Sequence, residues 1–185
     1  MDRTPISDLG GALAVGSIGF AGAFLIVDGI NGLFLLIEEY AQTNTWAVLF
    51  AAPTLVLAYA FGVIAMQVTG AVRTAYDVRH GRDPLASFVV VARLNNAHMV
   101  DRYREIRRSQ EFLQGVSPAL ALLGVGLFFA IRWMGPFYLF GYIAGTGCLA
   151  LSVLLPALAH RLALQSFALA EYADKALVDL VEPAA

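Results

Sequence analysis

An aspartate inside a long apolar run is the residue of this sequence best suited to do chemistry. Asp28 stands in the segment IVDGINGLF, residues 26–34, and Asn31 follows three positions later. On a helix, side chains three apart share one face, so the two polar groups can act together. An ionised carboxylate near the middle of a bilayer costs about 2.5–3.5 kcal/mol on insertion scales. We therefore expect the Asp28 carboxyl group to be protonated, paired or in contact with water.

Cationic partners for Asp28 are scarce in the apolar parts of the chain. Its long apolar segments contain no Lys or Arg in their middle, and Arg132 is expected at an outer edge, beside Glu38 and Glu39. The lack of an obvious salt bridge favours a water-lined cavity, or a ring of Asp28 side chains in an oligomer. In either case Asp28 and Asn31 would be the polar lining of a pore. A plain interhelical hydrogen bond is the alternative role for Asp28.

Four long apolar segments determine the class of protein that must position this aspartate. Of the 185 residues, 59% are hydrophobic and 14% are charged, whereas an ordinary soluble domain carries about a quarter charged residues. A bilayer core of about 30 Å needs about 20 helical residues to span it. Only helices or closed barrels satisfy the backbone in lipid, and continuous apolar runs without a period of two argue against a barrel. We expect an all-α, polytopic membrane protein with four transmembrane helices at residues 11–37, 46–70, 116–133 and 137–158.

The distribution of arginine predicts the orientation in the membrane. Eight arginines lie in residues 71–115, whereas residues 38–45 contain neither Lys nor Arg. Positive residues concentrate on the cytoplasmic side of membrane proteins. Residues 1–10, 71–115 and 159–185 are therefore expected in the cytoplasm, with both termini inside. The expected location is a bacterial inner (plasma) membrane.

Helices are expected to continue into the cytoplasm from the spans. Asp83 is a good N-cap and Pro84 suits a first helical position, so residues 84–113 are expected to form one helix. A second stripe of apolar residues continues from the last span, and that helix is expected to run to about Leu180. The two extensions are expected to pack together as a helical bundle. Apolar residues also recur along residues 84–113 at steps of four and three, and Asn96 lies within that stripe, with Asn95 next to it. A buried polar side chain there can set register or oligomeric state at a cost in stability.

A run of arginines in DRYREIRR, residues 101–108, forms a basic patch on the same extension. Its candidate ligands are anionic lipid headgroups or an acidic partner protein, with nucleic acid a remote option. The simpler interpretation is a solvated helix face whose charges pair locally. The four patch arginines are Arg102, Arg104, Arg107 and Arg108, and the expected local pairs are Asp101–Arg104, Glu105–Arg108 and Arg107–Glu111.

Small residues line one side of the first span and predict close helix packing. In membranes such residues let helix backbones approach each other. The same pattern fits packing within one bundle and self-association between copies. The residues expected at this packing face are Gly16, Gly19, Ala23, Gly29 and Gly32.

Sequence motifs for enzyme chemistry are not found. The chain has no phosphate-binding loop, zinc motif, nucleophile elbow or pair of catalytic carboxylates, and its histidines offer no facing pair for haem. Cys148 is the single cysteine and excludes both an intrachain disulfide and a cysteine-based metal site. We expect no enzyme activity, no cofactor and no metal.

Two functional classes fit these features, and a third fits less well. The first is a small homo-oligomeric channel with Asp28 and Asn31 on the ion path and the cytoplasmic helices as a docking platform. The second is a non-conducting membrane anchor, or scaffold, that recruits a soluble cytoplasmic partner. A secondary transporter is the weaker third option, because the two halves of the chain show no convincing repeat. Membrane lipids are expected partners in every case.

Overall fold

The protein is helical throughout the part that the structure describes, a computed structural model covering residues 5–32, 44–133 and 135–181. The elements are α1 (Pro5–Asn31), α3 (Asn44–Arg79), α4 (Pro84–Arg93), α5 (Ala97–Ala130), the short 3₁₀ turns η1 (Ile131–Trp133) and η2 (Gly135–Phe137), and α6 (Tyr138–Val181). Four helices carry segments long and apolar enough to cross a membrane: Leu9–Asn31, Pro53–Arg79, Ala97–Ala130 and Gly135–Val178. The predicted all-α class and its four long apolar helices are confirmed.

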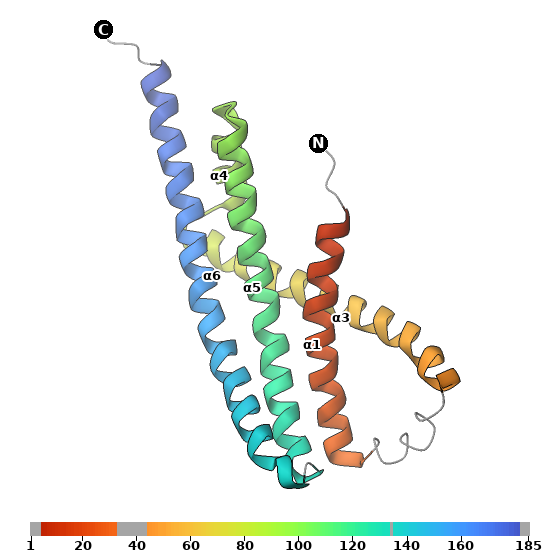
Figure 1. Cartoon of the computed structure of the whole chain (residues 1–185). Coiled ribbons are helices and arrows are strands. Elements are labelled where there is room, and N and C mark those ends of the chain that lie inside the picture. The colour runs from red at the N-terminus through yellow and green to blue at the C-terminus, as the bar shows by residue number, and fades with distance from the viewer. Residues whose placement is uncertain (1–4, 33–43, 134, 182–185) are drawn as a thin grey trace.

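Two very long antiparallel helices, α5 and α6, form the spine of the molecule (Figure 1). The turns η1 and η2 join them at one end, and α1 lies alongside α5. Helix α3 crosses behind the other three instead of running parallel to them. As the continuing stripe predicts, α6 runs without interruption to Val181.

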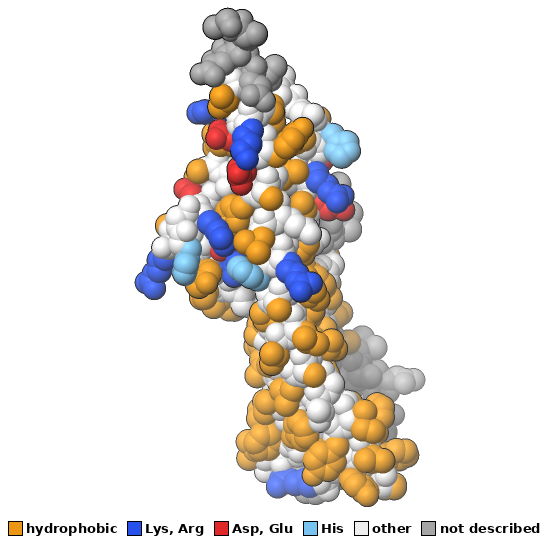
Figure 2. Space-filling view, turned by 90° about the vertical axis from the view of Figure 1, so that its left-hand side faces the viewer, with side chains coloured by type: hydrophobic (Ala, Val, Ile, Leu, Met, Phe, Trp, Pro, Cys, Tyr) orange, Lys and Arg blue, Asp and Glu red, His pale blue; other side chains and the backbone are white. Residues whose placement is uncertain are grey.

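Most charged side chains gather at one end of this spine, and a basic side chain lies at the tip of the opposite end (Figure 2). Hydrophobic side chains make up most of the coloured surface at that end. We call the first region the charged half: α4, residues 97–111 of α5 and residues 160–181 of α6. The apolar half consists of α1 from residue 9 onward, residues 112–130 of α5 and residues 138–159 of α6. The two stretches of α5 and α6 in the apolar half contain no Asp, Glu, Lys or Arg.

The oblique path of α3 agrees with the length of its uncharged segment. That segment extends from residue 44 to residue 72, whereas the one on α5 covers only residues 112–130. Each helical residue advances 1.5 Å, so a tilted helix needs more apolar residues to cross the same thickness of lipid. The longer segment of α3 therefore lets it cross at a tilt.

Glycine allows α1 and α3 to touch through their backbones. A Cβ atom added to Gly16 would overlap the carbonyl oxygen of Ala58, and one added to Gly62 would overlap the carbonyl oxygen of Ala12. The two glycines thus face each other's helix across the crossing point. Their lack of a side chain sets how closely the two helices approach.

On its other side α1 packs against α5, again through glycine. A Cβ atom at Gly22 would overlap the backbone of Leu122 and Leu123, and one at Gly29 would lie 2.6 Å from Cβ of Phe129. These glycines of α1 are therefore occupied by contacts within a single copy of the chain.

Three further residues expected at the packing face have different surroundings. Gly19 lies against the ring of Phe61 on α3, and Ala23 is half-buried. Gly32 has φ +66°, and its N–H donates to the carbonyl of Asp28 at 2.6 Å. This left-handed residue ends α1, which is a common use of glycine.

The expectation of one helix over residues 84–113 is wrong, because the chain turns between α4 and α5. Asn95 adopts φ +51°, a left-handed conformation that asparagine tolerates better than most residues. Asn96 then caps α5, its side-chain oxygen accepting from the N–H of Met99 at 3.3 Å. Both asparagines are exposed, so the buried position on which a register role would depend is not present.

This turn folds α4 back against the spine and gives the charged half a core of its own. The buried members are Val91 of α4, Tyr103 of α5, and Ala170 and Ala173 of α6. The Tyr103 hydroxyl donates to the carbonyl of Pro84 at 3.0 Å. Burial raises the pKa of this phenol, so it keeps the proton that it donates.

Alanine substitutions at two glycines of α3 test the backbone contact. Gly62→Ala is expected to lower the free energy of unfolding by about 1–3 kcal/mol, the usual cost of overpacking. Gly70→Ala meets open space and is expected to leave stability unchanged or raise it, because alanine favours the helix. Thermal unfolding in detergent measures both. Equal midpoints for the two variants would show that α1 and α3 do not meet at Gly62.

Candidate functional site

Asp28 lies near the end of α1 and is buried, with 7% of its surface exposed. Asn31 is exposed, and its side-chain amide donates to the carbonyl of Val27 on its own helix at 3.1 Å. The two residues belong to the last turns of α1, as their spacing predicts, but Asn31 is engaged locally. They do not form a shared polar surface.

A cation lies close to this end of α1. Arg132, in the turn η1, donates from Nη2 to the carbonyl of Ile30 at 3.3 Å. A positive side chain is favourable at a helix C-terminus, where unsatisfied carbonyls carry partial negative charge. The sequence placed Arg132 beside Glu38 and Glu39, which lie outside the described residues. Among the described residues, Arg132 contacts the carbonyl of Ile30, which follows Asp28 by two positions in the sequence.

A second polar cluster lies where the apolar half meets the charged half. Asp77 of α3 is buried with 1% exposed, and its Oδ1 lies 3.1 Å from Nε of Arg73. The same Nε donates to Oδ2 at 3.3 Å. The contact with Oδ1 lacks hydrogen-bond geometry, and that oxygen has no hydrogen-bond partner among the described residues. The ion pair thus compensates the buried charge while one oxygen stays unsatisfied.

Arg73 also joins α3 to α6. Its Nη2 lies 2.9 Å from Nδ1 of His160. A guanidinium group can only donate, so Nδ1 must accept and the imidazole is neutral, with its proton on Nε2. The cluster Arg73–Asp77–His160 therefore holds the end of the oblique helix against the spine.

Sequence reasoning missed this cluster. The spacing of Arg73 and Asp77 is that of a helical ion pair, which was the available signal. The third member, His160, is 87 positions away from Arg73. Only the crossing of α3 over α6 brings it into range.

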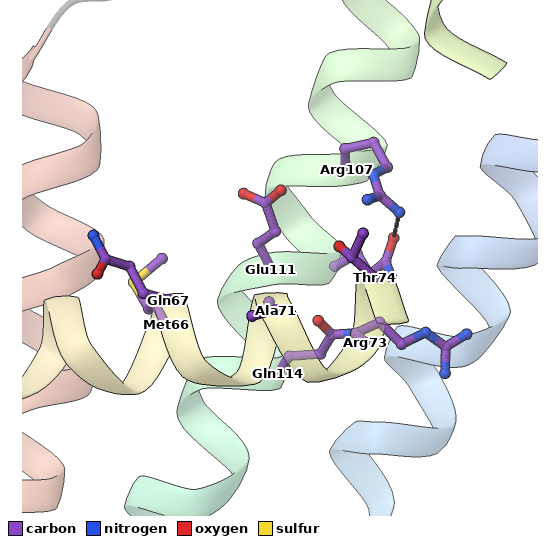
Figure 3. A pocket seen from close by; sticks show the side chains of 10 residues that line it. Met66, Gln67, Ala71, Arg73, Thr74, Arg107, Glu111 and Gln114 are labelled. Atoms are coloured by element: carbon purple, nitrogen blue, oxygen red, sulfur yellow. Dashed lines mark hydrogen bonds between the residues drawn. The ribbon is translucent and has the colours of Figure 1, made fainter. Parts of the chain in front are cut away.

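A polar pocket of about 290 Å³ adjoins this cluster, between α3 and α5 (Figure 3). Arg107 enters it from α5 and donates from Nη1 to Oε1 of Gln110 at 2.9 Å. Gln110 is itself fully buried. The lining residues are Met66, Gln67, Gly70, Ala71, Arg73 and Thr74 of α3 together with Arg107, Gln110, Glu111 and Gln114 of α5.

The arginine patch on α5 is only weakly paired. Of the three expected pairs, Asp101–Arg104 is present at 3.7 Å. Glu105 forms its ion pair with Arg102, at 3.9 Å, instead of with the expected partner Arg108. Both pairs are exposed, where such contacts stabilise little. The patch therefore stays available for other ligands.

Long apolar helices and the separation of charge indicate an integral membrane protein. Within the described part of the chain, no group of three or more His, Cys, Asp or Glu side chains could hold a metal ion. Comparison with protein-family models, with curated proteins and with solved structures found no match. The physical features of the chain are thus the basis for a functional proposal.

Removing Arg73 tests the buried cluster. Arg73→Ala leaves the Asp77 carboxylate uncompensated and is expected to lower the free energy of unfolding by about 3–5 kcal/mol. The double variant with Asp77→Ala is expected to recover part of that loss, because no lone charge stays buried. Lys175→Ala, which breaks the fully exposed pair with Glu171, serves as control and should change nothing measurable. Chemical denaturation in detergent gives all three values; equal losses for Arg73→Ala and Lys175→Ala would contradict the assignment.

Proposed function

We propose that this protein is a membrane anchor whose charged half is a docking platform for a soluble cytoplasmic partner. One observation carries the proposal: the charged half is a three-helix body with its own core, formed by Val91, Tyr103, Ala170 and Ala173. Such a body holds a fixed surface outside the lipid. A preformed surface reduces the ordering cost of binding.

Exposed apolar side chains on the surface of the platform support a protein partner. Large apolar side chains are exposed there although no lipid is expected at that level: Leu85 of α4 is 71% exposed and Tyr172 of α6 is 65% exposed. Val89 follows Leu85 by one helical turn and is exposed as well. Aromatic and aliphatic groups next to arginine are typical of interface centres. These side chains favour a protein partner over a purely solvated face.

A channel formed between copies is the second hypothesis, and the geometry favours it less. Asp28 is buried within one copy, and the amide of Asn31 is bonded to its own helix. Neither of the two cavities described for the chain is lined by these residues. Homo-oligomer formation and a transporter role also stay predictions.

The proposed topology places both termini and the platform in the cytoplasm. A Cys148→Ala background with Ser109→Cys on the platform, or Phe137→Cys at the opposite end of the spine, tests it. A membrane-impermeant maleimide applied to intact cells is expected to label only the Phe137→Cys variant, because only that end would face outward. Labelling of lysed cells gives the total amount of reactive cysteine at each site, against which labelling from outside is compared. Labelling of the Ser109→Cys variant from outside would reverse the topology.

Capture of a partner by the full-length protein tests the platform. Wild type, solubilised after cross-linking in its native membrane, is expected to retain one soluble protein in near-stoichiometric amount. The variant Leu85→Glu with Val89→Glu should retain at least tenfold less, because both substitutions place charge in an interface centre. Ala86→Glu with Ala92→Glu adds the same two charges at other exposed positions of α4 and is the matched control. Equal capture by all three proteins, or none by wild type, would contradict the proposal.

A further inference from the structure

The polar pocket between α3 and α5 lies at the level where charge begins on both helices. Arg73 is the first charged residue of α3 after residues 44–72. Glu111 is the last charged residue of α5 before residues 112–130. In a membrane this boundary corresponds to the layer of lipid headgroups.

Two opposite charges are presented to this pocket. The Arg107 guanidinium has five N–H donors, and one bonds to Gln110. The carboxylate of Glu111 has no hydrogen bond or ion pair among the described residues. Figure 3 shows the two side chains extending from α5 to different sides of the pocket. The expected helical pair between them is therefore not formed, and each charge can meet a ligand.

The rest of the lining adds neutral hydrogen-bonding groups. Thr74 contributes a hydroxyl, and Gln67 and Gln114 contribute amides. The guanidinium of Arg73 extends toward α6 (Figure 3). It contacts His160 of that helix and pairs with Asp77 of its own helix, α3. Arg107 is thus the cation of the pocket, and Glu111 its anion.

We propose that this pocket binds a phospholipid headgroup that carries both a phosphate and a primary ammonium group. The phosphate oxygens accept from Arg107, a charge-assisted contact that guanidinium forms well. The ammonium donates to Glu111. A headgroup without the ammonium leaves Glu111 next to a like charge, and a quaternary amine offers no N–H to donate. The inference rests on the membrane location but not on the docking role of the platform.

Size and surroundings agree with this ligand. The volume of about 290 Å³ equals about ten water molecules at about 30 Å³ each, enough for a phosphoethanolamine group. The adjacent surface of α3 is apolar, since Ile64, Val68 and Val72 are more than half exposed. Basic pockets between transmembrane helices are known to hold lipid headgroups. Acyl chains can lie along this part of α3.

Native mass spectrometry of the full-length protein in detergent, with added lipids of equal chain length, tests the proposal. Wild type is expected to retain the phosphoethanolamine lipid at least about fivefold better than the phosphoglycerol or phosphocholine lipid. Glu111→Gln should reverse the preference toward phosphoglycerol, and Arg107→Gln should reduce retention of the phosphoethanolamine lipid to the level of phosphocholine. A fivefold change corresponds to about 1 kcal/mol.

Arg102→Gln and Glu105→Gln are matched controls, because they remove the same charges from an exposed pair elsewhere on α5. Both should keep the wild-type preference, and circular dichroism confirms that every variant is folded. Wild type without headgroup preference, or controls that behave like the pocket variants, would overturn the proposal. Soluble phosphoethanolamine that binds as tightly as the lipid would show a free metabolite site and overturn the lipid assignment. The partner-capture experiment is unaffected by either result.

Discussion

The cost of placing charge in a bilayer is the constraint that organises this molecule. Arg73, Glu111 and His160 mark one level on α3, α5 and α6, and the segments beyond them contain no Asp, Glu, Lys or Arg until the far ends of the helices. Asp28 in α1 is the exception, and it is buried near the helix end that Arg132 contacts. The other ionic groups of α3, α4, α5 and α6 lie at or above the boundary, where they pair, cap helices or face water. The apolar helices that are long enough to cross a membrane and the separate charged half are thus two consequences of one separation of charge.

Inside the apolar half, close van der Waals packing must hold the helices together. The hydrophobic effect, which drives helices together in water, is absent in lipid because lipid is as apolar as the side chains. The backbone contacts at Gly16 and Gly62, and those of Gly22 and Gly29 with α5, provide close packing for α1 on two sides. Helix α3 depends on the first contact at one point and on the Arg73–Asp77–His160 cluster farther along. These two attachments explain how a helix that crosses the bundle obliquely keeps a defined place.

Helical periodicity and composition predicted the class, the long apolar helices and the continuation of α6, since these depend on local sequence and on lipid thickness. The break at Asn95 and Asn96 was missed, because apolar residues keep the same spacing on both sides of a short turn. The cluster around Arg73 and the pocket at Arg107 could not be predicted. Both arise where α3 crosses other helices, and crossing angles depend on close contacts such as Gly16 with Ala58, which a single sequence does not specify.

Ion and proton flux into liposomes that contain the full-length protein distinguishes a non-conducting membrane anchor from a channel. Wild type and Asp28→Asn are compared at matched insertion, over a range of pH and voltage. Neither protein is expected to raise flux above that of protein-free liposomes, because Asp28 is buried within one copy. Flux from wild type that Asp28→Asn abolishes would show a channel with Asp28 on its ion path, not a non-conducting anchor.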